Sequence, residues 1–231
     1  MFQIETGFDV AALARQFSAH GRLQIVNFLT RESVDLLYDQ LVRSESWRLA
    51  VNRGEVIHDF DLGDIARWPP ERTKLLDSAV ESGGSFGFQF RYDVIRMGES
   101  APPLLADFAS FLSSPDMLEF MRTVTGAPDI AFADAHASRY RPGHFLTTHD
   151  DAVDSMGRRS AYVLNLSPGW RPDWGGLLQF YDPMGNVSRA YTPGYNVLNI
   201  FRVPQAHSVS WVTPLAPNPR YAVTGWLRAT T

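Results

Sequence analysis

The first part of the chain alternates between helical and extended hydrophobic patterns. Apolar residues recur at helical spacing over 9–19, and Gly21 is suited to end that helix. The run 23–29 is typical of a strand. Thr30 then stands where a cap is needed for a helix over 31–43. These patterns predict a helix, a strand and a second helix in that order.

The alternation continues to Gly126, with proline pairs or Ser-Pro at the expected helix starts. Gly83-Gly84 is expected to end the first of these helices, and Asn52-Arg53-Gly54 is a turn signal within an extended stretch. The segment 86–97 alternates aromatic and polar residues, as a strand does. The expected elements are one or two strands in 47–59, a strand at 86–97, and helices at 70–80, 103–111 and 115–125.

From about Ile130 the pattern changes to short strand-like runs separated by Gly, Pro, Asn and Asp. Regular short strands of this kind favour an antiparallel sandwich or barrel, for which a jelly roll is the specific candidate. The runs are 132–140, 161–166, 177–181, 195–201, 207–212 and 221–227. We expect a single domain over 1–231, in which a helical and mixed part (1–128) supports a jelly-roll core (129–231).

Composition narrows the class of protein. Apolar residues make up 45% and charged residues 20%, which fits a globular chain and excludes a disordered one. The absence of cysteine excludes disulfides, thiolate metal sites and a cysteine nucleophile, and favours a cytoplasmic location. A net charge of −4 gives no basic footprint for nucleic acid. The N-terminus lacks a signal-peptide pattern and no long apolar run is present, so we expect no membrane association.

The candidate chemistry centres on His149, Asp151 and His207. The first two stand two apart in a segment expected to be extended, where such side chains share a face. His207 can join them when strands of the β-rich half pair. Two imidazoles and one carboxylate form the facial triad that suits non-haem Fe(II) and leaves neighbouring coordination positions open. We therefore predict that these three residues bind a metal and form the catalytic centre.

Each of these residues also has an ordinary structural explanation. With 6 His and 25 acidic residues, a His-x-Asp/Glu pattern arises by chance roughly 0.6 times per chain. Alone, His149 fits a surface turn, His207 the end of a loop, and Arg220 a solvated charge at the start of the last strand. Their order and their place in a strand-rich half favour the metal site over these explanations.

The residues around the triad resemble the 2-oxoglutarate- and Fe(II)-dependent oxygenases of the prolyl hydroxylase superfamily. In particular, the segment is similar to the N-terminal catalytic domain of ribosomal-protein prolyl hydroxylases, and the resemblance covers about 132–228. The positions that carry it are Tyr140, Gly143, Leu146, His149–Asp151, Arg158-Arg159, Leu164-Asn165, Trp170 or Trp174 with Gly175-Gly176, His207, Arg220 and Trp226.

The resemblance implies a fold, a reaction and further site residues. The fold is a double-stranded β-helix (jelly roll) of two antiparallel sheets with supporting N-terminal helices, in the α+β, mainly β class. Arg220 would pair with the distal carboxylate of the co-substrate 2-oxoglutarate, since a planar guanidinium matches a carboxylate. Tyr140 would donate a hydrogen bond nearby, or else be a core tyrosine. Relatives place another tyrosine where this chain has Val163.

The implied activity is hydroxylation of an unactivated C–H bond with dioxygen, and the carboxylate of Asp151 favours hydroxylation over halogenation. By resemblance, the substrate is a prolyl residue in a protein or peptide, and ascorbate is an additional candidate cofactor. Two alternatives stay open: a hydroxylase of a free amino acid or small natural product, and a catalytically silent jelly roll that binds a ligand. The sequence does not define the oligomeric state.

Overall fold

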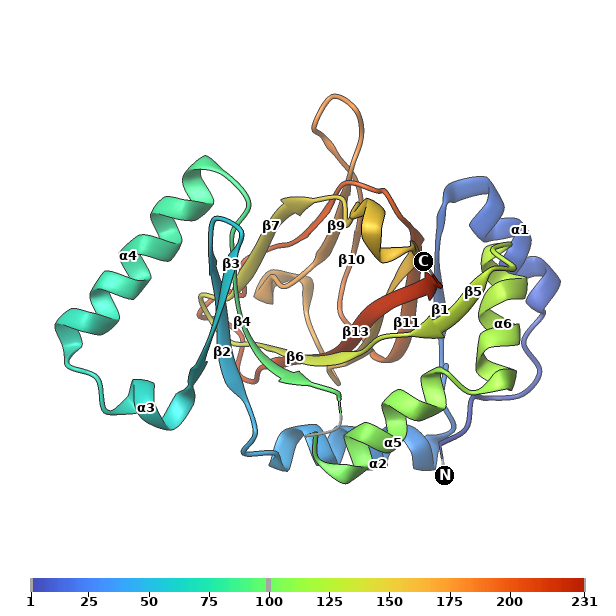
Figure 1. Cartoon of the computed structure of the whole chain (residues 1–231), viewed down its shortest axis with the longest axis horizontal. Coiled ribbons are helices and arrows are strands. Elements are labelled where there is room, and N and C mark those ends of the chain that lie inside the picture. The colour runs from blue at the N-terminus through green and yellow to red at the C-terminus, as the bar shows by residue number, and fades with distance from the viewer. Residues whose placement is uncertain (1, 99–100, 231) are drawn as a thin grey trace.

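The computed structural model describes residues 2–98 and 101–230 (Figure 1). The helices are α1 (Val10–His20), α2 (Arg31–Arg43), α3 (Leu62–Ala66), α4 (Pro70–Phe86), α5 (Pro103–Leu112) and α6 (Pro115–Thr125). The strands are β1 (Arg22–Val26), β2 (Arg48–Arg53), β3 (Val56–Asp61), β4 (Phe90–Arg96), β5 (Ile130–Ala133), β6 (His136–Tyr140), β7 (Phe145–His149), β8 (Arg158–Leu166), β9 (Leu178–Tyr181), β10 (Val187–Tyr191), β11 (Tyr195–Arg202), β12 (His207–Val209) and β13 (Arg220–Ala229). Short 3₁₀ turns lie at Asp154–Met156 and Pro172–Trp174.

Local signals placed most of the helices correctly. Helix α2 begins after Thr30, whose side chain accepts a hydrogen bond from the Ser33 N–H. Helix α1 ends at Gly21, which adopts the left-handed conformation at φ 65°. Helices α5 and α6 begin at the expected prolines.

The expected end of α4 was wrong. The helix runs through Gly83-Gly84 to Phe86, and β4 begins only at Phe90. A Cβ atom on Gly83 would lie 2.1 Å from Oε1 of Gln89, and one on Gly84 would lie 3.4 Å from the ring of Phe145. The two glycines therefore allow neighbouring side chains to approach the helix backbone, and they do not stop the helix.

The strands form one curled sheet in which every pairing is antiparallel. Among the described residues the order along it is β1-β11-β8-β13-β6-β4-β7-β12-β9-β10, with β2 and β3 attached to β4 and β5 attached to β13. The mainly β, jelly-roll class is thereby confirmed. The expected two sheets are joined, because β4 pairs with β6 along one stretch and with β7 along another. Strand β10 was not anticipated from the sequence, and β7 was anticipated only as an extended segment at His149.

The sheet contains strands from both sides of residue 128, where we expected the supporting part to end and the jelly-roll core to begin. Strand β1 pairs with β11, and β4 lies between β6 and β7 in the middle of the sheet. Helices α1 and α6 lie together on one side, α2 and α5 run along another, and α4 stands outside β2 and β3 on the opposite side (Figure 1). Within the described ranges, no helix combines the length and apolarity that a membrane crossing requires.

Candidate active site

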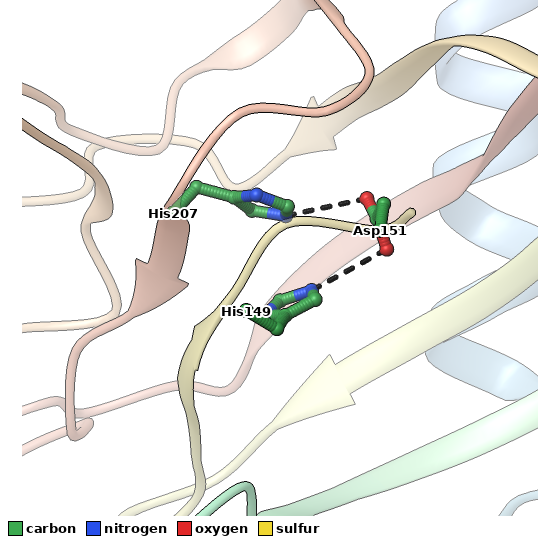
Figure 2. Close-up of side chains that lie close together, drawn as sticks. All are labelled: His149, Asp151 and His207. Carbon is green, nitrogen blue, oxygen red and sulfur yellow. Dashed lines mark ion pairs between the residues drawn. The ribbon is translucent and has the colours of Figure 1, made fainter. Parts of the chain in front are cut away.

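Three side chains converge at one end of the curled sheet. His149 is the last residue of β7 and His207 the first of β12, and the two stand opposite each other in the antiparallel register. Their ring centroids are 4.1 Å apart. The carboxylate of Asp151 faces both rings from one side, with Oδ1 3.5 Å from Nε2 of His149 and Oδ2 3.4 Å from Nε2 of His207 (Figure 2). One ligand atom from each residue falls within 4.8 Å of the others, so the three can bind a single metal ion.

The reason given from sequence for the proximity of His149 and Asp151 was incomplete. Strand β7 ends at His149, and Asp151 has a left-handed backbone with φ 64°. Strand alternation therefore does not place its carboxylate. The chain instead turns sharply after the strand, and the side chain of Asp150 supports that turn by accepting a hydrogen bond from the N–H of Ala152 at 3.0 Å.

Backbone carbonyls orient both imidazoles. Nδ1 of His149 lies 3.0 Å from the carbonyl oxygen of Thr147, and Nδ1 of His207 lies 2.8 Å from that of Gln205. A carbonyl can only accept, so each Nδ1 carries the proton and each Nε2 keeps its lone pair. Both lone pairs are directed at the Asp151 side, as metal-ligating histidines require.

Burial keeps His207 in the protonation state that suits a metal. Desolvation, with a smaller contribution from His149, lowers the pKa of His207 to about 4, so its imidazole is neutral.

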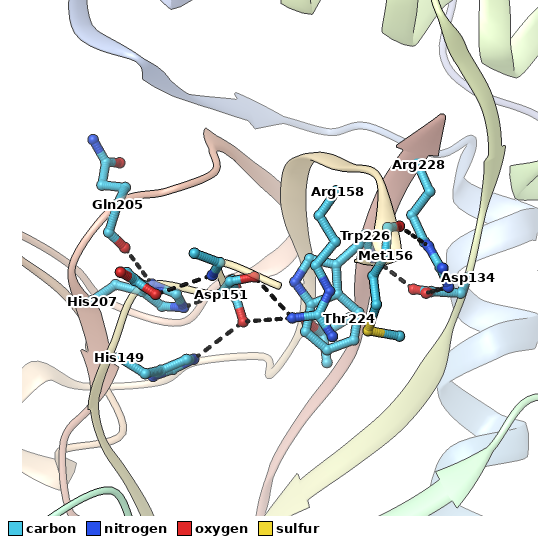
Figure 3. A network of polar contacts seen from close by, with 12 residues as sticks. Asp134, His149, Asp151, Met156, Arg158, Gln205, His207, Thr224, Trp226 and Arg228 are labelled. Carbon is cyan, nitrogen blue, oxygen red and sulfur yellow. Dashed lines mark hydrogen bonds and ion pairs between the residues drawn. The ribbon is translucent and has the colours of Figure 1, made fainter. Parts of the chain in front are cut away.

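Arg158 connects Asp151 to the far wall of the site (Figure 3). Its Nη1 donates to the carbonyl of Asp151 at 2.9 Å and lies 3.8 Å from Oδ1 of the same residue. Its guanidinium stacks on Trp226, with Cζ 3.6 Å from the ring centroid. The backbone N–H of Trp226 in turn donates to Asp134, whose carboxylate also accepts from Arg228. This network holds Asp151 in place, and the geometry of the triad depends on that residue.

The triad opens into a cavity of about 560 Å³. The cavity is lined mainly by apolar and aromatic side chains, a character typical of small-molecule sites. Arg220 and Tyr140 line the same cavity as the triad. All five residues predicted from the sequence for the site therefore come together around one space.

Among the described residues, Arg220 is a buried cation without an anionic partner. Its side chain is 1% exposed, and its one hydrogen bond to the described protein goes from Nη2 to the neutral Oδ1 of Asn165 at 3.2 Å. Nε of Arg220 is buried without a partner, and among described residues no carboxylate lies within ion-pair distance. Desolvation lowers its pKa from the ordinary value. A buried unpaired charge is costly, so the arrangement suits an anionic ligand that would pair with it.

Tyr140 forms the wall next to this cation. Cζ of Arg220 lies 5.0 Å from the centroid of the Tyr140 ring, and Tyr92 stacks on the other side with centroids 5.1 Å apart and planes inclined by 20°. Burial raises the pKa of Tyr92 to about 12 and that of Tyr140 further, so both hydroxyls keep their protons. Each is a neutral donor available to a ligand in the cavity.

The structure adds residues to the five predicted for the site. His136 lines the cavity together with Tyr92 and Arg96. Tyr92 and His136 lie on adjacent strands of the sheet and face the same cavity, a relation that depends on the β4–β6 pairing. The signal available from sequence was their alternation with apolar neighbours, which is equally typical of a packed strand.

Three neighbouring residues differ in their relation to the site. His144 is buried and is absent from the metal-binding cluster of the described residues. Val163 lines the cavity at the position where relatives were expected to carry a tyrosine. Arg159 points outward and pairs with Asp129 at 2.7 Å.

Comparisons with known proteins agree with this geometry. Residues 135–228 match the family model of the 2OG-Fe(II) oxygenase superfamily. Prolyl 3-hydroxylase OGFOD1 of Mus musculus is 28% identical over 130 residues, which are 53% of this chain and 22% of that protein. The Xenopus laevis protein of the same name is 31% identical over 130 residues, again 53% of this chain and 23% of that protein. The chain thus spans less than a quarter of the length of these relatives.

A crystal structure of a Pseudomonas putida prolyl-4-hydroxylase superimposes with a TM-score of 0.63 at 19% identity, covering 96% of this chain and all of that one. The chain therefore shares the jelly-roll fold of that structure, and its His-Asp-His cluster is a candidate metal site within this fold. Over residues 135–228 the chain is similar to the 2OG-Fe(II) oxygenase superfamily, and this stretch contains the three residues of the His-Asp-His cluster. The matched superfamily is named for 2-oxoglutarate and Fe(II), and two imidazoles with one carboxylate are a donor set that suits this metal.

Proposed function

We propose that the protein is an Fe(II)- and 2-oxoglutarate-dependent hydroxylase of a prolyl residue in a protein or peptide. The observation that carries the proposal is that His149, Asp151, His207 and the unpaired Arg220 face one cavity. The donor set fits Fe(II), and the buried guanidinium fits the far carboxylate of a dicarboxylate co-substrate.

The residues of the chain have distinct roles in this proposal. His149, Asp151 and His207 would hold the metal, and Arg158 keeps Asp151 in place by donating to its carbonyl. Arg220 would hold the distal carboxylate of 2-oxoglutarate, next to the hydroxyl of Tyr140. When bound, Fe(II) and 2-oxoglutarate supply the oxidising chemistry, and the protein contributes orientation and exclusion of water.

The overall reaction balances without another reactant. A C–H bond of the substrate, dioxygen and 2-oxoglutarate yield a C–OH group, succinate and carbon dioxide. One oxygen atom enters the substrate and the other enters succinate. 2-Oxoglutarate, which loses its carboxyl group, supplies the two electrons that the reaction requires besides those of the C–H bond.

The charges around the cavity favour a peptide over a free amino acid. A free amino acid needs partners for both an ammonium and a carboxylate. Arg96 already binds Asp59 through two hydrogen bonds, and Arg158 is engaged with Asp151. Neither cation is therefore free to bind the carboxylate of such a substrate.

The mouth of the cavity supports the same choice. Three apolar side chains that line it are exposed: Ile57 by 54%, Phe88 by 47% and Val153 by 41%. Exposed apolar groups around a site are typical of a surface that contacts another protein segment. The prolyl assignment itself is supported by the two relatives, which are named prolyl 3-hydroxylases.

The test is turnover with proline-containing peptides. The wild-type protein, supplied with Fe(II), 2-oxoglutarate and dioxygen, should release succinate and add one oxygen atom to a prolyl residue, located by tandem mass spectrometry. His207→Ala should do neither, whereas His20→Ala, at the exposed end of α1, should match the wild type. Absence of succinate from every peptide would contradict the proposal, and oxygen transfer to a free amino acid would replace its substrate.

Two further predictions from the sequence belong with this proposal. We expect ascorbate to sustain turnover by keeping the metal reduced, which a comparison of turnover number with and without ascorbate would test. The predicted cytoplasmic location would be tested by fractionating cells that express the tagged protein.

A further inference from the structure

Arg220 is held by a neutral group where an ion pair would be the usual arrangement. Asn165 lies on β8, paired in register with Ala222 of β13 and Val197 of β11, and it is buried. Its Oδ1 accepts the hydrogen bond from Nη2 of Arg220. Asn165 is not among the described residues that line the cavity, so it can act on a ligand only through Arg220.

The orientation of the Asn165 amide is fixed by its other contacts. Nδ2 donates to the carbonyl of Val197 at 3.2 Å and lies 3.4 Å from that of Val163. Both of these groups are acceptors, so the amide nitrogen must face them and the amide oxygen must face Arg220. The strand pairings on both sides of β8 thereby aim one neutral acceptor at the guanidinium.

A second buried site in the same sheet shows the contrasting arrangement. Asp93 on β4 is fully buried and pairs with both Arg139 and Arg141, each at 2.8 Å. There the arginines meet a carboxylate, and the charges compensate one another. At Arg220 the fold supplies an amide of nearly the same shape as an aspartate but without its charge.

We propose that Asn165 is a positioning residue that fixes the Arg220 guanidinium while leaving its charge uncompensated for the distal carboxylate of 2-oxoglutarate. This inference rests on the proposed function, in which Arg220 binds that carboxylate. A carboxylate at position 165 would pair with Arg220 and compete with the co-substrate. An apolar residue would leave the charge free but remove the group that orients it.

Two substitutions separate this role from a merely structural one. Calorimetric binding of 2-oxoglutarate to the Mn(II)-loaded protein should weaken roughly tenfold in Asn165→Ala, which loses one hydrogen bond to a charged group. It should weaken by about 100-fold or more in Asn165→Asp, because the introduced charge neutralises the site. A merely structural role predicts instead that Mn(II) affinity falls together with 2-oxoglutarate affinity, because aspartate also turns an oxygen toward the carbonyls of Val163 and Val197 and disturbs the sheet.

Asn199→Asp provides a matched control. Asn199 is a buried asparagine on the neighbouring β11, and its Oδ1 accepts from Gln24 instead of an arginine. This variant should bind 2-oxoglutarate like the wild type, and all variants should keep the wild-type affinity for Mn(II).

The outcomes also separate this inference from the function on which it rests. Wild-type protein that binds no 2-oxoglutarate overturns both. If the wild type binds, a loss in Asn165→Asp no larger than that in Asn165→Ala overturns the inference alone. Should the aspartate variant fail to fold, unchanged affinity in Asn165→Ala overturns it.

Discussion

Replacing Arg220 by methionine should stabilise the ligand-free protein and abolish binding of 2-oxoglutarate. Methionine fills a similar unbranched volume but carries no charge. In the ligand-free protein the guanidinium is buried, its Nε has no partner, and its hydrogen bond is to the neutral Asn165. The buried cation therefore favours ligand binding while it lowers the stability of the ligand-free protein, a trade-off expected at functional sites.

The size of the effect follows from two opposing contributions. Replacing buried ionic groups by apolar groups of similar volume is often neutral or stabilises by about 1–4 kcal/mol. Against this, Oδ1 of Asn165 loses its donor, which costs about 1 kcal/mol. We expect a net gain of about 2 kcal/mol, which corresponds to about 4–8 °C in the melting temperature for a chain of this length.

Thermal unfolding with and without 2-oxoglutarate measures both sides of the trade-off. At a ligand concentration of about 100 Kd, the wild type should gain about 2.7 kcal/mol, and Arg220→Met should gain nothing. Arg139→Met is the matched control, because Arg139 is paired with the buried Asp93, and its loss should destabilise by about 2 kcal/mol or more. A lower melting temperature for Arg220→Met than for the wild type, or retained binding of 2-oxoglutarate, would refute the reasoning.

Three more predictions follow from the structure. His207→Ala removes one of three ligands and should weaken Mn(II) binding about 100-fold or more, measured by calorimetry, whereas an unchanged affinity would exclude His207 as a ligand. Burial lowers the pKa of His136 to about 4 and that of His144 to about 3, so the unfolded chain binds more protons below pH 6.5. The free energy of unfolding should therefore fall by about 2 kcal/mol per histidine between about pH 7 and pH 5, and less in His144→Leu; equal falls in both proteins would contradict this. Strands β1 and β4 are built into the sheet of the C-terminal half, so urea unfolding should be a single transition in which circular dichroism and tryptophan fluorescence change together. Two separated transitions would overturn the single-domain prediction.

The beginnings of helices and the general class of the fold could be predicted from the sequence. The Thr30 cap and the glycine after α1 act through contacts within a few residues, so the sequence carries their signal directly. The succession of short strands likewise predicted an antiparallel jelly roll. Local signals failed where the cause lay elsewhere in the fold, as at Gly83-Gly84, whose small size serves Gln89 and Phe145.

The sequence by itself determined which residue types were available for the site. The site residues could be named from the sequence because imidazole, carboxylate and guanidinium groups in this order along the chain fit few other kinds of site. These residues are His149, Asp151, His207, Arg220 and Tyr140. The family resemblance supplied the function that we propose for them together.

Only the tertiary structure decided how these groups meet. The register of β7 against β12 brings the two imidazoles together, and the left-handed backbone at Asp151 turns its carboxylate between them. The same is true of Arg220, which has no anionic partner in the part of the chain that the structure describes, because this depends on all the residues packed around it. Strand pairing and burial depend on residues far apart in the chain, so no local pattern encodes them.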